Sequence, residues 1–562
     1  MTSLLQHWIS KQAQRRPEAV AVVMEDKTLT YGELEGLTNQ FARLLRAAGC
    51  HSGDRVAFAI PKSPAAIVAI GGILKADCIH VPIDTSSPAP RVAKLLKSSE
   101  PRYLLGVTAS AALLEDLFSQ DDFRTWLRVG WMDDFAGETR KFDSAFRWSD
   151  IALQSAAPVD NVHTSQDPAH ILFTSGSTGE PKGVVITHSN VIHFVEWATR
   201  YFGMTDSDRI SCHPPLHFDL ATFDIFGAFA TGAQLHLVSP ELSFLPNKLA
   251  DFMHRSELTQ WFSVPSVLNY MAKFDALRHH DFPSLQRLLW CGEVLPTPTL
   301  RYWMMHLPHV TFTNLYGPTE ATIASSYYTV PQCPADDTQP IPIGTACEGE
   351  ELLVLDAGLR PMPRGEVGDL YIGGVGLSPG YWRDSAKTAA AFVAYGSGRI
   401  YRTGDLAHVG ADGMVYFVGR ADTQIKSRGY RIELGEIEVA LNALQELKEC
   451  AVVAVPTDGF ETNLICCAYV AQENIRTNPA GIRRRLSAVV PSYMLPARWM
   501  DFVQLPKNAN GKIDRRKIQE IFAAQDSENL SLKQPQPDIY SQSGDTKEYP
   551  VPALNSSSDK PE

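Results

Sequence analysis

Hydrophobic and polar positions follow two different periods along most of the chain. Runs rich in β-branched residues, such as "RVAFAI" (55–60), "IHVPI" (79–83) and "QLHLVSP" (234–240), predict strands. By contrast, "YGELEGLTNQFARLLRAAG" (31–49) has apolar residues at spacings of three and four and ends in glycine, as an amphipathic helix does. Strands that alternate with helices predict an α/β fold.

The pattern changes near "GRADTQIKSRGYRIELGEIEVALNAL" (419–444), after which the elements become shorter and more charged. We therefore predict a large N-terminal domain over residues 1–421 and a small C-terminal α+β domain over 422–525. Residues 526–562 are rich in Ser, Pro, Gln and Asp and poor in core-forming residues, which predicts a disordered tail.

Composition narrows the class of protein. A chain of 562 residues is too long for one hydrophobic core, so at least two domains are expected. The net charge of −12 argues against nucleic acid as the main partner. The apolar stretches are interrupted by charges, which excludes a membrane span, and the first residues lack the order of a signal peptide. Nine cysteines without a C-x-x-C pair indicate neither a disulfide framework nor a zinc site, so we expect a cytoplasmic enzyme.

One motif carries candidate chemistry. In "ILFTSGSTGEPKGVVITH" (171–188) a strand-like run leads into Ser, Thr and Gly residues and then Lys182. Backbone N–H groups and hydroxyls in such a loop can converge on an anion such as a phosphate. It is not a Walker A loop, because Lys182 follows Gly179 by three residues and precedes a glycine. The alternative is a flexible surface loop.

Further motifs contain aromatic and acidic side chains next to turns. "NLYGPTEATI" (314–323) places Tyr316, whose ring can stack on a purine, before a Gly-Pro turn, and Glu320, which can hold Mg²⁺, after it. Asp405 in "YRTGDL" can accept hydrogen bonds from two ribose hydroxyls. "LPKNANGKIDRRK" (505–517) places Lys512 on a glycine-containing turn. Each has an ordinary alternative, such as a turn cap for Asp405 or a solvated lysine for Lys512.

Taken together and in order, these motifs resemble the adenylate-forming enzymes, and among them the amino-acid adenylation domains of nonribosomal peptide synthesis. The resemblance covers roughly residues 10–520. It rests on "LTYGEL", "LKADCIHVPID", "FTSGSTGEPKGV", "FDLATFDIF", "NLYGPTEATI", "GDLYIGGVGLSPGYW", "YRTGDL", "GRADTQIKSRGYRIELGEIE" and "LPKNANGKID". It implies β-sheets layered with helices in the large domain, and a small domain that rotates on a hinge at Asp422. One departure is "KADCIHVP", where the family usually has Gly, Ala and Tyr at Asp77, Cys78 and His80.

The resemblance also implies a reaction, in which a substrate carboxylate attacks the α-phosphate of ATP and pyrophosphate leaves. Fixed donors and a cation would offset the charge that builds on the phosphate oxygens. Lys512, Thr174 and Glu320 are the implied catalytic residues, with Mg²⁺ held by Glu320. The implied ATP-binding residues are Thr174, Ser175, Gly176, Ser177, Thr178, Gly179, Lys182, Asn314, Tyr316, Gly317, Thr319, Asp405, Arg420 and Lys512.

Asp219 in "FDLATFDIF" is the residue that points to an amino acid. In the family this position meets the substrate α-ammonium, and a buried cation needs such a partner. The other implied substrate-binding residues are uncharged: Phe218, Leu220, Phe223, Ser263, Leu289, Cys291, Gly292, Leu315, Ile323 and Ala324. An uncharged pocket filled by bulky side chains favours a small neutral amino acid, and we expect alanine.

The second half-reaction implied by the resemblance is transfer to a thiol. Gly429 would let a phosphopantetheine arm pass close to the backbone. No carrier-like segment is recognisable after residue 525, so we expect a free-standing ligase that loads a separate carrier protein in trans, alone or with a small activating partner protein. The alternatives are an acid–coenzyme A ligase, which would share the loop, Glu320, Asp405 and Lys512 but not Asp219, and a non-catalytic nucleotide-binding protein.

Overall fold

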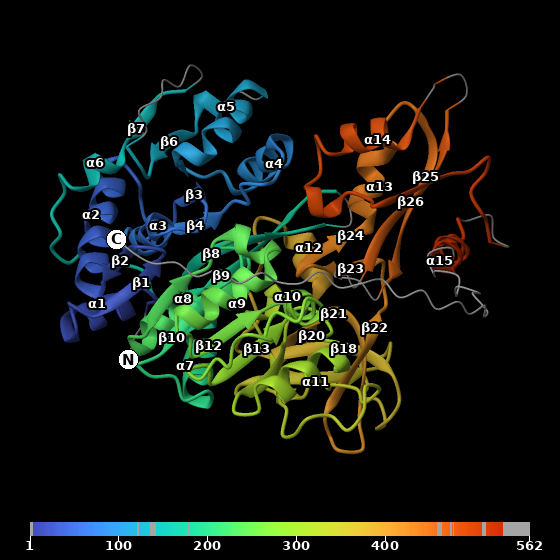
Figure 1. Cartoon of the computed structure of the whole chain (residues 1–562). Helices are drawn as coiled ribbons and strands as arrows, with labels where there is room; N and C mark the ends of the chain where they lie inside the picture. The colour runs from blue at the N-terminus through green and yellow to red at the C-terminus, as the bar shows by residue number, and fades with distance from the viewer. Residues whose placement is uncertain are drawn as a thin grey trace, which may run out of the picture.

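The computed structural model describes residues 4–120, 123–134, 142–176, 179–457, 463–472, 475, 477–508 and 513–531 of the chain. Within them, residues up to about 420 build three sheets with helices packed between and around them, and the later residues form a smaller α+β part (Figure 1).

Two large sheets are mostly parallel at their centres. The nine-stranded sheet has the order β16 (Thr345–Ala346), β15 (Ser326–Thr329), β14 (Thr311–Tyr316), β13 (Arg287–Cys291), β12 (Gln260–Ser263), β10 (Arg209–Cys212), β11 (Gln234–Leu237), β1 (Val20–Met24) and β2 (Lys27–Thr30). The eight-stranded sheet has the order β19 (Gly380–Tyr381), β9 (Lys182–Thr187), β8 (Pro168–Thr174), β4 (Ile79–Pro82), β3 (Arg55–Ala59), β5 (Tyr103–Gly106), β6 (Arg128–Trp131) and β7 (Ser144–Phe146).

A five-stranded antiparallel sheet completes the large part of the fold. It contains β17 (Glu350–Leu355), β18 (Gly368–Gly374), β21 (Gly398–Val409), β20 (Phe392–Tyr395) and β22 (Val415–Arg420), and β22 pairs with β21. The smaller part contains the hairpin β23 (Gln424–Ser427) and β24 (Tyr430–Glu433), and a sheet of β25 (Leu447–Pro456), β26 (Asn463–Ala471) and β27 (Arg498–Asp501).

Helices cover the faces of these sheets. They are α1 (His7–Arg15), α2 (Tyr31–Ala47), α3 (Pro64–Lys75), α4 (Ala89–Ser99), α5 (Ala111–Gln120), α6 (Trp148–Ile151), α7 (His188–Tyr201), α8 (Asp219–Thr231), α9 (Pro246–Arg255), α10 (Pro265–Lys273), α11 (Thr297–His306), α12 (Ser385–Ala391), α13 (Leu434–Asn442), α14 (Pro479–Leu486) and α15 (Arg515–Ser531).

Local sequence accounts for where several of these helices begin and how they pack. Thr30 and Glu33 form a capping box at the start of α2, since each side chain accepts the other residue's backbone N–H. Helix α3 is buried almost all round, and its Gly72 allows close packing on α2, because a Cβ there would lie 2.5 Å from a ring carbon of Phe41. Helices of this kind are buried in a large core.

The predicted α/β fold, with a large N-terminal part and a smaller C-terminal part, is confirmed. The predicted strands 55–60, 79–83 and 234–240 correspond to β3, β4 and β11, and the predicted helix 31–49 corresponds to α2. Helix α15 continues to Ser531, which extends into the segment predicted as a tail from residue 526. The boundaries at 421 and 525 and the rotation of the small domain stay predictions.

All nine cysteines lie among the described residues and are free thiols, of which only Cys333 is exposed. None of the helices in the described ranges is both long enough and apolar enough to cross a lipid bilayer.

Three histidines are buried together between the eight-stranded sheet and α7. His80 and His170 are in register on the neighbouring strands β4 and β8, with ring centroids 4.9 Å apart, and His188 begins α7. Burial lowers the pKa of His170 and of His188 to about 3 and lowers the pKa of His80 well below its usual value. The folded protein therefore holds these rings neutral at pH values where the unfolded chain, with histidine pKa values of about 6.5, takes up protons.

This cluster predicts a loss of stability in mild acid. Above about pH 6.5 each neutral histidine makes its full contribution to the free energy of unfolding. This contribution falls by as much as about 1.4 kcal/mol per pH unit as the pH drops towards 3. Replacement His80→Leu should make the decline of the melting temperature between pH 6.5 and 4.5 shallower than in the wild type. The exposed His279 serves as the control, and an identical decline for His80→Leu and His279→Leu would contradict the prediction.

Candidate functional site

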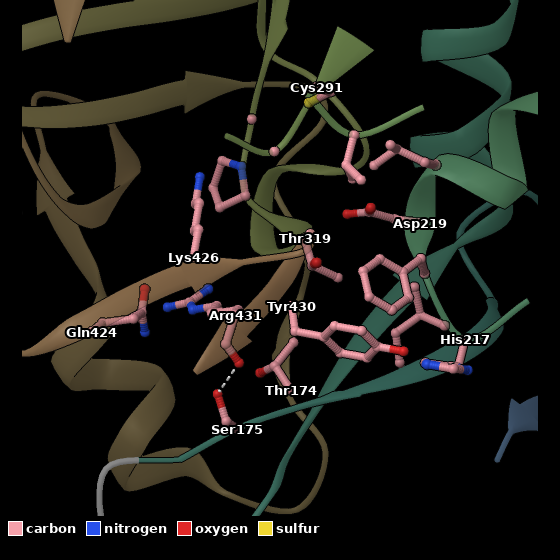
Figure 2. Close-up of a pocket in the computed structure, with 18 of the residues that line it drawn as sticks. Thr174, Ser175, His217, Asp219, Cys291, Thr319, Gln424, Lys426, Tyr430 and Arg431 are labelled. Atoms are coloured by element: carbon pink, nitrogen blue, oxygen red, sulfur yellow. Dashed lines mark hydrogen bonds between the residues drawn. The ribbon is translucent and has the colours of Figure 1, made fainter. Parts of the chain in front are cut away.

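A cavity of about 130 Å³ lies where the carboxyl ends of β8, β13 and β14 face hairpin β23–β24. The carboxyl ends of parallel strands are the usual place for a ligand in open α/β sheets. Twelve residues predicted as site residues line the cavity: Thr174, Ser175, Phe218, Asp219, Leu220, Cys291, Gly292, Gly317, Thr319, Asp405, Arg420 and Gly429. Figure 2 shows side chains from the large part and from the hairpin directed into one space.

Asp219 is the first residue of α8 and lies in the wall of this cavity. Burial raises the pKa of its carboxyl group to about 6, although hydrogen bonds from Thr319 and from the backbone of Leu220 act in the opposite direction. Asp219 forms no ion pair with any described residue. A carboxylate in this position gains free energy from a cation that enters the cavity.

Tyr316, Asp405 and Arg420 form a connected polar group, of which Asp405 and Arg420 line the cavity. The Tyr316 hydroxyl donates to Asp405 Oδ2 at 2.5 Å, and Arg420 Nη1 donates to Asp405 Oδ1 at 2.6 Å. Arg420 also forms a bidentate contact with Asp422, the residue predicted as the hinge. These hydrogen bonds fix the Asp405 carboxylate and the Tyr316 ring in place.

The loop 174–182 begins at the end of β8, and its first residues reach the cavity. Thr174 Oγ1 is buried and has no hydrogen-bond partner among the described residues. Ser175 Oγ donates to the backbone oxygen of Arg431 at 2.6 Å (Figure 2). Lys182 Nζ lies 5.2 Å from the centre of the Tyr381 ring. The unpaired Thr174 hydroxyl, the Ser175 hydroxyl and the Lys182 amine therefore give this loop groups that suit an anionic ligand.

Glu320 is buried, with none of its surface exposed, and its carboxylate is surrounded by donors. Arg431 Nη1 contacts both carboxylate oxygens, at 3.1 and 2.8 Å, and the Tyr381 hydroxyl donates to Oε1 at 2.8 Å. Burial alone would raise the pKa of Glu320, but the charges of Arg431 and Lys182 hold it at about 2. Glu320 is therefore ionised, and its countercharge comes from the hairpin.

Hairpin β23–β24 is also attached to the large part through its turn. Gly429 has a φ of +80° and donates its N–H to Glu293 Oε1 at 2.9 Å. Lys426 Nζ lies 5.6 Å from the centre of the Tyr316 ring. The Tyr430 ring is stacked on Tyr493 with centroids 3.6 Å apart.

Several predicted site residues do not line the cavity as it stands. Gly176, Gly179, Lys182, Asn314, Tyr316, Glu320 and Asp422 lie in the loops and strands around it. The side chains of Phe223, Ser263, Leu289, Leu315, Ile323 and Ala324 are buried in the layers behind it. The Ser263 hydroxyl already accepts a hydrogen bond from the Trp261 ring. Ser177, Thr178 and Lys512 lie outside the described residues.

Most of the cavity residues that the hairpin contributes were not predicted from the sequence. Only Gly429 was singled out from "SRGYRIELGEIE", whereas Gln424, Lys426, Tyr430 and Arg431 also line the cavity. The missed residues on the large part are Arg91, Leu172, Phe173, His217, Val264, Pro318 and Thr403, and Tyr493 comes from the smaller part. The stretch "IKSRGYR" (425–431) contains three basic residues, Lys426, Arg428 and Arg431, but basic residues alone do not show which of them faces the cavity.

Family models and similar proteins all assign this chain to the same family. A family model described as AMP-binding enzyme matches residues 9–382, and one described as AMP-binding enzyme C-terminal domain matches residues 436–512. Bacitracin synthase 1 of Bacillus licheniformis is 33% identical over 529 residues, which cover 93% of this chain and 10% of that protein. The dimodular nonribosomal peptide synthase of Bacillus subtilis (strain 168) is 33% identical over 519 residues, which cover 92% of this chain and 21% of that protein. The chain thus spans only about a tenth to a fifth of the length of these relatives.

A solved structure covers nearly the same length as this chain. The Vibrio cholerae adenylation domain AlmE, in complex with glycyl-adenosine-5'-phosphate, matches with a TM-score of 0.80 and 26% identity, over 93% of this chain and 98% of that chain.

The turn of the hairpin provides a test of how closely it packs on the large part. A Cβ at Gly429 would lie 2.6 Å from Val264 Cγ1, so Gly429→Ala should displace the hairpin and raise the hydrogen exchange of residues 424–433. Gly413→Ala is the matched control, because Gly413 has a φ of +81° and no atom lies within 4 Å of the position that a Cβ would take there. Both variants carry a backbone strain of about 1–2 kcal/mol, but only the first meets a neighbour. Unchanged exchange in Gly429→Ala would contradict this packing.

Proposed function

Because the chain belongs to the AMP-binding enzyme family, we propose that it uses ATP to convert a small neutral amino acid, with alanine favoured, into its aminoacyl-adenylate. A carboxylate oxygen of the amino acid attacks the α-phosphorus of ATP, the bond to the β-phosphate oxygen breaks, and pyrophosphate leaves. The aminoacyl group then passes to the phosphopantetheine thiol of a separate carrier protein, and AMP leaves.

The observation that carries this proposal is the Asp219 carboxylate. It faces the cavity without an ion-pair partner among the described residues, and the α-ammonium of an amino acid supplies the cation that it lacks. The side chains of Leu220, Val264 and Cys291 nearby are uncharged. A charged substrate side chain would be buried there without a partner, so the geometry favours a small neutral one.

The other polar side chains of the site are proposed to bind ATP. In the proposal, the hydroxyls of Thr174 and Ser175 and the amine of Lys182 meet the phosphates, Asp405 accepts the ribose hydroxyls, and the Tyr316 ring meets the base. Donors that are already fixed at the phosphates offset charge as it develops in the transition state. Lys512 is proposed to bridge the attacking carboxylate and the ribose. Asp422 is proposed as the hinge that brings Lys512 in and later withdraws it.

The thiol transfer needs a path for the phosphopantetheine arm, which is proposed to pass Gly429. A carrier that acts in trans, a small activating partner protein and a cytoplasmic location remain part of the proposal. The chain's similarity to segments of nonribosomal peptide synthases supports the carrier.

Mg²⁺ is expected at Glu320 from the sequence, but the residues present do not fit the ion in this arrangement. Both carboxylate oxygens contact Arg431, so a divalent cation would lie against a guanidinium of the same sign. Among the described residues, no three His, Cys, Asp or Glu side chains are grouped so that they could hold a metal ion. We therefore derive no step through Mg²⁺.

Exchange of labelled pyrophosphate into ATP tests the proposed function. The assay is run with all common amino acids in both stereochemical forms, and with aryl and fatty acids for comparison. Exchange that depends on a small neutral amino acid supports the proposal. Exchange that depends only on acids without an amine would favour an acid–coenzyme A ligase, and no exchange with any acid would contradict adenylation.

Asp219→Asn should reduce amino-acid-dependent exchange by about two to four orders of magnitude. This loss corresponds to about 3–5 kcal/mol for a buried cation that loses its partner. Asp224→Asn is the control, since Asp224 is a buried carboxylate of the same helix that does not line the cavity. Equal effects of the two substitutions on kcat/KM for the amino acid would argue that Asp219 does not meet the ammonium.

A further inference from the structure

The loop between β10 and α8 leads into the amino-acid side of the proposed site. It runs from Cys212, the last residue of β10, to Asp219, the first residue of α8. The residues at its end that line the cavity are His217, Phe218, Asp219 and Leu220. The start of α8 has no side-chain cap, because the N-cap residue is Phe218, whose ring cannot accept a backbone N–H. The position of the Asp219 carboxylate therefore depends on what holds the loop before it.

Lys62 holds the beginning of this loop from the other large sheet. Its Nζ donates to the backbone oxygens of Cys212 and His213, at 2.7 and 2.6 Å, and the residue is only 7% exposed. Lys62 lies between β3 and α3, next to Ser63, whose hydroxyl caps α3 and donates to the Pro61 backbone oxygen. The amine is thus fixed at the end of a strand of the eight-stranded sheet, and it binds carbonyls at the end of a strand of the nine-stranded sheet.

The two carbonyls account for the burial of this amine. A buried amine is destabilising unless hydrogen bonds replace the water that it loses. Lys62 forms no ion pair within the part of the chain that the structure describes. Asp224 is the carboxylate that faces it, but both carboxylate oxygens of Asp224 are buried and have no hydrogen-bond partner among the described residues. The loop is therefore held by the carbonyl contacts of Lys62 and not by Asp224.

This connection joins the two sides of the proposed reaction. The hydroxyls of Thr174 and Ser175, which are proposed to meet the phosphates, lie at the end of β8 in the eight-stranded sheet. Asp219 follows β10 of the nine-stranded sheet. An attacking oxygen must be held about 3–3.5 Å from the atom that it attacks before it reacts efficiently. A contact that fixes one strand end relative to the other therefore affects how the amino acid approaches ATP.

We propose that Lys62 is a positioning residue for the amino-acid site: it sets where Asp219 meets the substrate ammonium, and it touches neither the amino acid nor ATP. It acts through the backbone carbonyls of Cys212 and His213, since Lys62 itself does not line the cavity. The inference rests on the proposed function for the identity of the ammonium. Loss of the contact should weaken binding of the amino acid more than binding of ATP, because the loop 213–218 contains no residue assigned to ATP.

Pyrophosphate exchange by the Lys62→Met variant of the full chain tests the proposal, with the amino acid that supports exchange in the wild type. Methionine has a similar length but no N–H to donate. KM for the amino acid should rise about tenfold or more, within the roughly 100-fold loss that a misplacement of about 1 Å can cause. KM for ATP should stay close to that of the wild type. Lys62→Gln keeps N–H donors on a shorter side chain and should give an intermediate rise, so the test remains possible if Lys62→Met does not fold.

Lys75→Met is the matched control. Lys75 is a second buried lysine, its amine is held by Glu35 and Asn39, and it does not line the cavity. Both substitutions remove a buried amine, so both should lower the melting temperature. Only Lys62→Met should raise KM for the amino acid, and equal rises in the two variants would overturn the proposal.

A double-mutant cycle with Asp219→Asn separates positioning from a general loss of structure. Residues that act through one network have non-additive effects. Adding Lys62→Met to Asp219→Asn should therefore reduce kcat/KM for the amino acid much less than Lys62→Met does in the wild type. Additive losses would refute the proposal, because Lys62 would then act independently of Asp219.

Hydrogen exchange of residues 213–221 in the protein without ligands distinguishes a failure of this inference from a failure of the proposed function. Hydrogen exchange should rise in Lys62→Met and not in Lys75→Met. This result would support the role of Lys62 in holding the loop even if no amino acid is activated, in which case only the proposed function fails. Amino-acid-dependent pyrophosphate exchange in the wild type, together with unchanged KM and hydrogen exchange in Lys62→Met, would leave the proposed function in place and refute the positioning role.

Discussion

A carboxylate that has no access to water must have a positive charge beside it, and the arrangement of this site follows from how Glu320 obtains one. The large part of the fold supplies the carboxylate on the turn after β14, but the guanidinium comes from Arg431 in hairpin β23–β24. This buried ion pair therefore connects the two parts of the protein at the cavity, as does the buried pair of Arg91 and Glu436. The positions of Lys426, Gly429 and Tyr430 in the cavity lining follow from the same seating.

The parallel strands and the hairpin contribute different kinds of surface to the cavity. Strand β8 of the eight-stranded sheet and the paired strands β13 and β14 of the nine-stranded sheet end at the cavity, so Thr174, Cys291 and the turn after Tyr316 are each held by a hydrogen-bonded sheet. The hairpin has only two strands and meets the large part through Arg431 on Glu320, Gly429 on Glu293 and the Tyr430 ring against Phe218. The cavity is therefore lined on one side by strand ends of the two large sheets and on the other by a two-stranded hairpin.

The sequence was informative where a function depends on a short local pattern. The strand before Thr174, the acidic start of α8 at Asp219 and the turn around Glu320 could each be recognised in a few consecutive residues. Arg431 could not, because its role depends on how two separately folded parts meet, and periodicity along the chain contains no such information. Phe223, Leu289 and Leu315 show a second limit: an apolar residue near a strand end or in a buried helix can face a cavity or the core behind it, and hydrophobicity is the same in both cases.

Cys291 has a consequence for the lifetime of the proposed intermediate. An aminoacyl-adenylate is a reactive mixed anhydride, and a thiolate in the same cavity would capture it before an external acceptor arrived. Burial raises the pKa of the Cys291 thiol to about 12, so at neutral pH this sulfur stays protonated and is a poor nucleophile. In the proposed reaction, a protonated Cys291 would leave the activated acyl group for a thiol that enters from outside.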